Sequence, residues 1–261
     1  MMRTATVSKD RWSLLLLLLV GSATCRVASA EDAGALDGKT LKASGIEVDI
    51  QKREIRLDAT VCLSRGILEY LVCLPGTFEH ETIFSAKCKP SQLHLALLAI
   101  GLAPRPFVPD EEWWEKAQED KQVRVDITVE YVQDGKKQRR RITEFLVNRE
   151  RQDGAVPDRW VFTGSAFYKE EGKTRYAADV TGVVIGLIPE GAAVIQFGEK
   201  AGIPYRGDDQ GLEINTDTTP AVGTAVRLIF TPHAEKGKQA EQPTKGIAPD
   251  QPKGGSDGKP D

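Results

Sequence analysis

The chain has 261 residues, of which 40% are hydrophobic and 28% are charged, a composition typical of a globular protein with enough apolar mass for a core. The formal net charge is −3, and such a balance does not favour a nucleic-acid partner. We therefore expect a folded protein whose partner is not nucleic acid.

The first thirty residues have the pattern of a secretory signal peptide. The basic residues Arg3, Lys9 and Arg11 precede the apolar run Leu14–Val20, and a small-residue site, Ala28–Ala30, follows. The apolar run is too short to span a bilayer, and no second run of about 18 apolar residues occurs downstream. We expect export to the periplasm or the cell exterior, with no transmembrane segment after cleavage.

Cleavage would leave a more acidic chain. It removes four basic residues and one acidic residue, so Lys plus Arg falls from 35 to 31, Asp plus Glu falls from 38 to 37, and the net charge becomes about −6. A lipid anchor at Cys25 is the alternative, but Ser22-Ala23-Thr24 is a poor match to a lipoprotein cleavage site. The cleaved, unanchored form is therefore the expectation.

Composition divides the rest of the chain into three parts. We expect residues 31–44 to be a linker and residues 45–232 to form one β-rich domain, or two tightly packed halves. Residues 233–261 have Ile247 as their only large aliphatic residue. Such a segment cannot bury enough surface to offset its ordering entropy, so we expect a disordered tail.

Strand patterns dominate the first part of the domain. Turn signals at Ser64–Gly66 and Pro75-Gly76 separate segments rich in alternating apolar residues, and this arrangement predicts a three-stranded antiparallel meander. The predicted strands here are Ile46–Ile50, Glu54–Leu63, Ile67–Leu74 and Glu79–Ser85.

One helix is predicted over residues 90–100, because Pro90 suits a first helical position and apolar residues recur at helical spacing up to Gly101. Leu95 and Leu98 make its other faces apolar too, so we expect it to be buried on most sides. A possible short second helix covers residues 110–120, with Asp110 as its N-cap.

The pattern then returns to strands. Residues 123–131 alternate strictly, and Asp134-Gly135 predicts a hairpin turn into residues 139–148. Further predicted strands are Arg159–Thr163, Ala177–Ile188, Ala193–Phe197 and Thr224–Thr231. Without a repeat or a strict strand–helix alternation, the fold class is α+β, mostly β, built from antiparallel sheets.

A candidate functional cluster lies around the Pro75-Gly76 turn. If that turn joins two antiparallel strands, the side chains of Cys73 and His80 share one sheet face and Glu81 points to the other. A thiol beside an imidazole is the minimum for an activated nucleophile. A structural role in the core is the competing interpretation, because cysteine is among the most buried residue types.

The cysteines and histidines also offer weak candidate metal ligands. Zinc would be the alternative to having no cofactor, but no CxxC pair or HExxH motif supports a site. Three cysteines remain after cleavage, and one disulfide with one free thiol is the simplest outcome in an oxidising compartment, with the connectivity open. The weak candidate ligands are Cys62, Cys73, His80, Cys88 and His94.

Three other features have a functional and a structural interpretation. His94, which completes the candidate cluster, is expected to be a buried histidine bonded to backbone or to Ser91 rather than a base. The basic stretch Lys136–Arg141 could hold a phosphate or an acidic surface, but a solvated hairpin tip is favoured. Of Trp113 and Trp114, we expect one in the core and one partly exposed, rather than a stacking platform.

The stretches "LEYLVCLPGTFEHETIF" and "KPSQLHLALLAIGL" resemble the YdjY-domain family of secreted bacterial proteins, whose pattern has a cysteine, a short gap, a His-Glu pair and a "KP...H.ALL..G" helix. Later segments, including "YAADVTGVVIGL" and "NTDTTPAVGTAVRLIFTP", are also similar, so the resemblance covers most of residues 45–232. In that pattern a basic residue often precedes the His-Glu pair, whereas this chain has Phe78 and Glu79 there. The resemblance implies a domain and no particular activity.

We therefore expect an exported envelope protein that acts as a non-catalytic binding or structural module, with an unknown envelope protein or a small ligand as its partner. The alternative is a metal- or thiol-dependent enzyme centred on Cys73 and His80.

Overall fold

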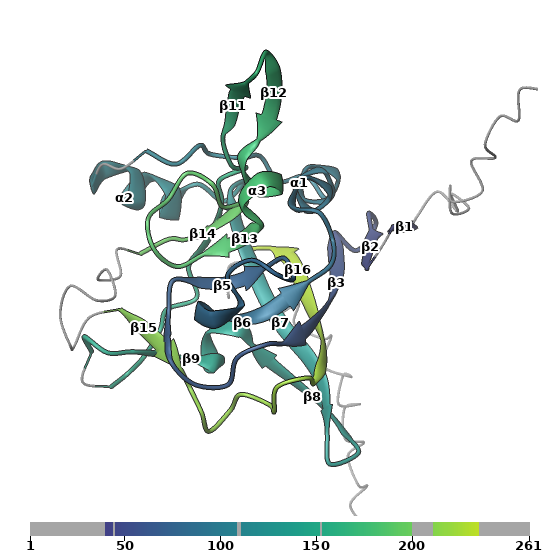
Figure 1. The fold of residues 1–261 in the computed structure, drawn as a ribbon, viewed down its shortest axis with the longest axis vertical. Coiled ribbons are helices and arrows are strands. Elements are labelled where there is room, and N and C mark those ends of the chain that lie inside the picture. Colours follow the sequence, from purple (N-terminus) through teal and green to yellow (C-terminus); the bar gives the residue numbers. More distant parts are fainter. Residues whose placement is uncertain (1–39, 44, 109–110, 152, 200–210, 235–261) are drawn as a thin grey trace, which may run out of the picture. The chain divides into compact units, whose positions relative to one another are not determined.

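The computed structural model describes residues 40–43, 45–108, 111–151, 153–199 and 211–234 (Figure 1). The expected signal peptide, most of the expected linker and nearly all of the expected tail lie outside these residues. Within the expected linker, residues 40–43 form strand β1.

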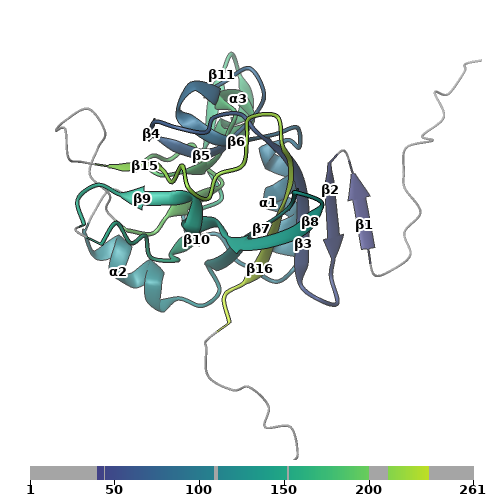
Figure 2. The same ribbon diagram turned by 90° about the horizontal axis from the view of Figure 1, so that it is seen from below.

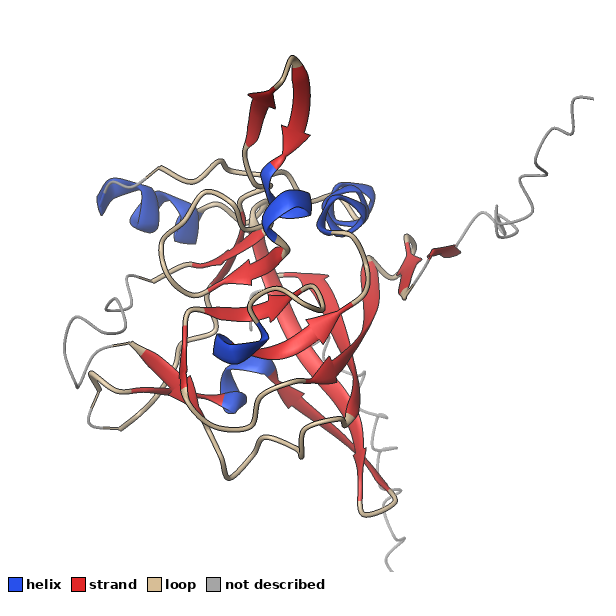
Figure 3. Ribbon diagram, in the orientation of Figure 1, coloured by secondary structure: helices blue, strands red, loops and turns tan. Residues whose placement is uncertain are grey.

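Strands make up 41% of the described chain and helices 17%, and Figure 3 shows how few helices accompany the strands. The strands are β1 (Thr40–Ala43), β2 (Ile46–Asp49), β3 (Glu54–Val61), β4 (Ile67–Leu68), β5 (Tyr70–Cys73), β6 (Thr82–Ala86), β7 (Arg124–Gln133), β8 (Lys136–Arg141), β9 (Leu146–Asn148), β10 (Trp160–Phe162), β11 (Phe167–Glu170), β12 (Lys173–Tyr176), β13 (Val183–Gly186), β14 (Ile195–Phe197), β15 (Leu212–Ile214) and β16 (Ala225–Pro232). The helices are α1 (Pro90–Ala99), α2 (Glu111–Glu119), α3 (Ala177–Thr181) and the 3₁₀ turns η1 (Glu79–Glu81) and η2 (Ile142–Phe145).

The main sheet closes into an eight-stranded barrel. Its strands follow the order β3-β16-β7-β10-β14-β13-β5-β6, and pairing of β6 with β3 completes the ring. Strands β1 and β2 continue the sheet outward from β3 (Figure 2). The mostly β class is confirmed, but the main sheet is a closed barrel rather than simply antiparallel sheets. In addition, β5 pairs with β6 in parallel, and so does β13 with β14.

Strand β7 shows why these residues form a barrel wall. Its alternate residues Val125, Ile127, Val129 and Tyr131 are buried, and the residues between them are half-buried. The turn at Asp134-Gly135 is confirmed: both residues have positive φ, and Gln133 of β7 pairs with Lys136 of β8.

The predicted antiparallel meander after β3 is wrong. Residues 67–74 split into β4 and β5, which belong to different sheets, and β5 runs parallel to β6 instead of forming a hairpin with it. The reason is the connection between them. The Thr77 hydroxyl donates to the Leu74 carbonyl oxygen at 2.7 Å, and the Thr82 hydroxyl donates to the Phe78 carbonyl oxygen at 2.6 Å, so the chain curls into η1 before β6 begins.

The predicted strand 177–188 is also partly wrong, because its first five residues form helix α3. The helix ends at Gly182, which has φ +82° and donates its N–H to the Ala178 carbonyl oxygen. A left-handed glycine at this position is a common helix stop. Strand β13 begins only after it.

Helix α1 confirms the prediction for residues 90–100 in position but not in burial. Leu93 and Leu97 are buried, whereas Leu95 is 65% exposed and Leu98 is 41% exposed. Helix α2 is also confirmed, although its predicted N-cap, Asp110, lies outside the described residues.

The core fills the barrel and extends under its coverings. Large aromatic side chains lie inside it, for example Phe84 and Phe145 in an edge-to-face contact at 5.6 Å. A second, smaller apolar cluster joins Trp113 and Ala117 of α2 to Val161 of β10, and this cluster holds α2 on the outside of the barrel.

Two of the insertions between barrel strands carry the helices α1, α2 and α3. The first holds α1 and α2, between β6 and β7; the second holds the β11–β12 hairpin and α3, between β10 and β13. In Figure 1 the β11–β12 hairpin stands away from the barrel strands, next to α3. No helix within the described ranges is long and apolar enough to cross a membrane.

Candidate functional site

The Cys73 thiol lies at the end of β5, fully buried and surrounded by hydrogen-bonding groups. Interaction with the Cys62 side chain, and smaller ones with Thr82, Thr77 and the backbone N–H of Phe78, outweigh burial and lower the pKa of Cys73 to about 6. The site can therefore stabilise a thiolate.

Cys62, which acts most strongly on the ionisation of Cys73, follows another strand, β3. Its Sγ lies 3.1 Å from the Thr82 carbonyl oxygen and 3.3 Å from the Ile83 carbonyl oxygen. The side chain is half-buried and forms part of the wall of an open groove of about 720 Å³, next to Pro75. Interaction with Cys73 and burial raise the pKa of Cys62.

His80 does not lie on a sheet face with Cys73, contrary to the prediction. It belongs to η1, where its side chain is 73% exposed and its Nε2 lies 3.5 Å from the Glu81 carboxylate. Glu81 is more enclosed and adds its charge to burial in raising the pKa of Glu69. Among the described residues, no histidine is one of the groups that act on the Cys73 thiol.

Cys88 lies apart from the other two cysteines, directly before α1. It is buried, its Sγ is 3.4 Å from the Lys89 carbonyl oxygen and 3.6 Å from Gln92 Oε1, and burial raises its pKa to about 11. Of the five weak metal-ligand candidates, the structure therefore joins only Cys62 and Cys73. Within the described ranges no three His, Cys, Asp or Glu side chains are grouped as a metal site would require.

His94 links two insertions of the barrel. Its Nδ1 lies 3.0 Å from the Gly164 carbonyl oxygen and 2.9 Å from the Tyr176 hydroxyl, which itself donates to the same carbonyl oxygen. Burial lowers the pKa of His94, so the neutral ring is favoured. The predicted bond to backbone is confirmed, although the side chain is half-buried. Ser91 instead donates to Asp179 of α3 through its N–H and its hydroxyl.

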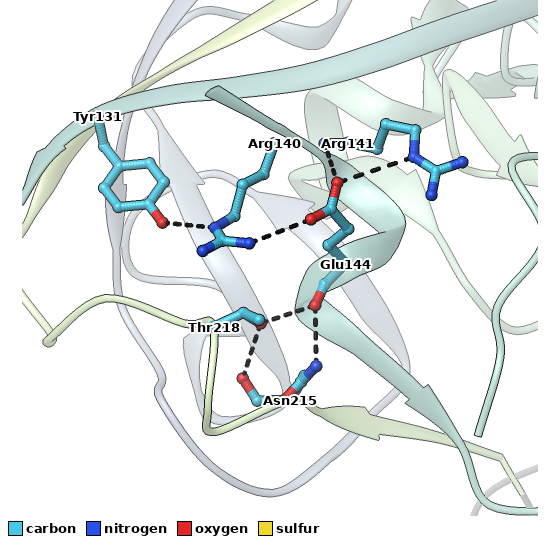
Figure 4. Close-up of polar contacts among 6 residues, drawn as sticks. All are labelled: Tyr131, Arg140, Arg141, Glu144, Asn215 and Thr218. Atoms are coloured by element: carbon cyan, nitrogen blue, oxygen red, sulfur yellow. Dashed lines mark hydrogen bonds and ion pairs between the residues drawn. The ribbon is translucent and has the colours of Figure 1, made fainter. Parts of the chain in front are cut away.

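The basic stretch 136–141 forms strand β8 rather than a hairpin tip. Its arginines bond to side chains of the same domain, as Figure 4 shows for Arg140 and Arg141. Arg140 donates to the Tyr131 hydroxyl at 3.1 Å and to Glu144 at 3.2 Å, while Arg141 donates its backbone N–H to Glu144. Arg139 forms an ion pair with Glu130 of β7 at 3.4 Å. These contacts favour a role in fixing the edge strand over phosphate binding.

The tryptophan pair follows the prediction, with one residue in the core and one partly exposed. Trp113 is buried and donates its indole N–H to the Pro106 carbonyl oxygen at 2.8 Å. Trp114 is half-buried, and its ring packs edge-to-face on Trp113 at 4.8 Å. The pair closes the smaller apolar cluster.

A surface that the sequence analysis did not identify lies on the two insertions. Helix α1 exposes Leu95 and Leu98, α3 exposes Val180, and β11 exposes Phe167 and Tyr168; we call these five side chains the apolar cap. Leu95 also borders a small groove of about 210 Å³, with α1 on one side and β2 on the other. One signal was present in the sequence: Glu171-Gly172 is a turn between two short segments that now prove to be β11 and β12.

The elements of the cap are held together by polar contacts. Ser91, Leu95 and Leu98 are spaced to share one stripe of α1, and the bond from Ser91 to Asp179 brings α3 alongside that stripe. Helix α3 in turn contacts β12. The exposed apolar side chains therefore belong to neighbouring elements rather than to scattered positions.

Fold and site together define a closed β-barrel domain with the buried Cys73 thiol at the end of one of its strands and an apolar cap on its insertions. The YdjY domain matches residues 46–231, and the chain belongs to that family, as the resemblance implied. No curated protein and no solved structure matches the chain.

Proposed function

We propose that this chain is an exported, non-catalytic binding module of the cell envelope, and that its apolar cap binds a protein partner. The apolar cap is the observation that carries the proposal. Phe167 is 66% exposed, Leu95 is 65% exposed and Val180 is 53% exposed, on three elements that lie outside the barrel.

Exposed side chains of this size have an energetic consequence. Burying a Leu, Val or Phe side chain contributes roughly 1.5–3 kcal/mol, and an exposed apolar surface leaves that contribution unused in the monomer. Single exposed apolar residues are ordinary, whereas neighbouring ones on adjacent elements are typical of protein-binding sites. A polar residue at these positions would serve the barrel equally well, since none of the five belongs to its core.

The test compares two surface variants of the tagged, full-length chain in its native host. The cap variant is Leu95→Ser with Phe167→Ser and Val180→Ser; the control carries Val132→Ser and Val222→Ser, which remove equally exposed apolar side chains elsewhere. Proteins captured from the envelope fraction are quantified by mass spectrometry. Binding to each captured protein is then measured with purified components.

We expect the wild-type chain and the control variant to bind the same envelope protein, and the cap variant to bind it at least about tenfold more weakly, a loss of about 1.4 kcal/mol. Equal binding by the cap variant, with unchanged thermal unfolding of both variants, would assign the partner to another surface. Failure of the wild-type chain to bind any envelope protein would reject the binding module.

A thiol-dependent enzyme centred on Cys73 is the second candidate, because hydrogen bonds to its sulfur favour the thiolate. His80 would not be its base, since it is exposed on η1. Rapid alkylation of Cys73 in the native protein at pH 7 would support this candidate. Near-stoichiometric zinc in elemental analysis would instead support the metal-dependent alternative.

A further inference from the structure

Within the described residues, strand β8 pairs with β7 along one edge and with no strand along the other. Figure 1 shows the end of the β7–β8 hairpin extending past the other barrel strands. An open edge carries a row of backbone N–H and C=O groups to which a further strand can bond. Which strand β8 accepts depends on these groups and on the side chains around them.

The register of the hairpin identifies the open backbone groups. Its loop has two residues, so Gln133 and Lys136 form a hydrogen-bonded pair, and such pairs recur at every second residue of β8. The residues between these pairs, Lys137 and Arg139, point their N–H and C=O groups away from β7. The open edge therefore offers donors and acceptors at two successive bonding positions.

The side chains on the outer face of the sheet form a row of alternating charge that ends at this edge. Asp58 of β3 lies opposite Arg227 of β16. Arg227 lies opposite Glu130 of β7, and Glu130 lies opposite Arg139 of β8. Two of these neighbours form ion pairs, Arg227 with Asp58 at 2.9 Å and Arg139 with Glu130 at 3.4 Å. A further strand beside β8 would continue the alternation with an acidic side chain.

The rest of the strand adds positive charge that is not compensated. Lys136 and Lys137 are exposed, and neither forms an ion pair with any described residue. Lys137 is two residues from Arg139 and shares its sheet face. A basic strand, or β8 of a second copy of the chain, would bring like charges opposite each other, which is destabilising. The edge therefore rejects such strands and favours an acidic one.

We propose that the open edge of β8 binds an extended acidic segment of another protein, which adds as an antiparallel strand. Acidic side chains of that segment lie opposite Lys137 and Arg139, and its backbone bonds to theirs. A phosphate or a lipid surface could meet the charges but could not bond to both kinds of backbone group along the edge. The site lies on other elements than the apolar cap, so it stands or falls independently of the proposed function.

The test measures binding of a fluorescein-labelled peptide of alternating Thr and Glu, TETETET, to the purified full chain by fluorescence anisotropy. In an antiparallel pairing, the Glu residues opposite Lys137 and Arg139 point their own N–H groups at β8. Methyl groups on the Glu nitrogens therefore remove the bonding donors without changing the charge. Methyl groups on the Thr nitrogens, which face away from β8, are the matched control. The peptide TKTKTKT tests the sign of the charge.

We expect TETETET to bind, methylation of Glu to weaken binding at least about tenfold, and methylation of Thr to change it less than about twofold. TKTKTKT should not bind, because its charges repel those of β8. In hydrogen exchange followed by NMR, binding should slow the exchange of the Lys137 and Arg139 amides. The amides of Gln138 and Arg140, which already bond to β7, should exchange as before.

Two protein variants separate the open N–H group from the charge. Lys137→Pro removes an outward donor without removing a bond to β7, and it should weaken binding at least about tenfold. Lys137→Gln keeps the donor and removes the charge, and it should weaken binding only about two- to fivefold. Thermal unfolding shows whether each variant is folded. If Lys137→Pro does not fold, the methylated peptides decide the question on the wild-type chain.

Equal binding of the two methylated peptides, or weaker binding of the Thr-methylated one alone, would overturn the proposal, because the predicted backbone bonds would then be absent. Binding of phosphatidylglycerol vesicles without binding of TETETET would also overturn it and assign the edge to a membrane surface. The same holds if TETETET does not bind at concentrations up to about 1 mM.

Discussion

Replacing Glu190 with Gln should change how the stability of the domain depends on pH. Glu190 is half-buried, its Oε1 is buried without a hydrogen-bond partner, and its other contact is the Tyr70 hydroxyl. Burial, with a smaller contribution from the charge of Glu69, raises the pKa of Glu190 from 4.5 to about 7. The folded protein therefore holds this carboxyl protonated at a pH where the unfolded chain ionises it.

The sign follows from the two pKa values of this carboxyl. The folded state binds the proton more tightly, so this carboxyl stabilises the fold fully below about pH 4.5 and the stabilisation is lost as the pH rises towards 7. At about 1.4 kcal/mol per pKa unit the full effect is about 3 kcal/mol. The side chain is partly open to solvent, which screens it, so we expect about 1–2 kcal/mol.

The assay is urea unfolding of the wild-type protein and of Glu190→Gln at pH 5 and pH 8. The wild-type free energy of unfolding should fall between these pH values by about 1–2 kcal/mol more than that of the variant, because the amide carries no charge at either pH. Glu171→Gln, in the exposed turn of the β11–β12 hairpin, is the matched control and should follow the wild type. An identical pH dependence in the wild type and Glu190→Gln would refute the reasoning.

Three further predictions concern other parts of the chain. Gly164→Ala should lower the free energy of unfolding by at least about 2 kcal/mol in urea titrations, because Gly164 has φ +78° and an added Cβ would lie 2.6 Å from Pro104 Cβ. His94 should make the protein less stable as the pH falls below about 6.5, since its folded pKa is lowered and the unfolded ring protonates first, and His94→Gln should remove that part of the acid sensitivity in the same titrations. Intact-mass measurement of the protein from its native host should show a chain that begins at Glu31, whereas a retained N-terminus or a lipid on Cys25 would contradict the expected processing.

Local patterns predicted the elements whose partners lie nearby in the sequence. The alternation in β7, the Asp134-Gly135 turn and the stop of α1 at Gly101 were all predicted, because each depends on a few adjacent residues. The stop of α3 at Gly182 was also visible, but the Val- and Thr-rich run around it favoured a strand. Closure of the barrel could not be predicted, since it depends on which distant strand meets β6.

The candidate cluster shows the same limit. Pro75-Gly76 is a good hairpin signal, and the hairpin would have joined Cys73 to His80. Side-chain hydrogen bonds of Thr77 and Thr82 redirect the chain instead, and no sequence pattern distinguishes them from ordinary exposed hydroxyls.

Two sets of polar contacts made by α1 have a common place in the fold. His94 and Tyr176 meet at Gly164, and Ser91 meets Asp179, so both sets of contacts join α1 of the first insertion to the second insertion. The exposed apolar side chains of the proposed binding surface belong to these same elements. The barrel strands are held by backbone hydrogen bonds and need neither set of contacts. A binding surface built from two insertions needs both sets, because they fix the position of one insertion relative to the other. On the proposed function, His94 holds the two insertions that carry the apolar cap in place, and the barrel supports both.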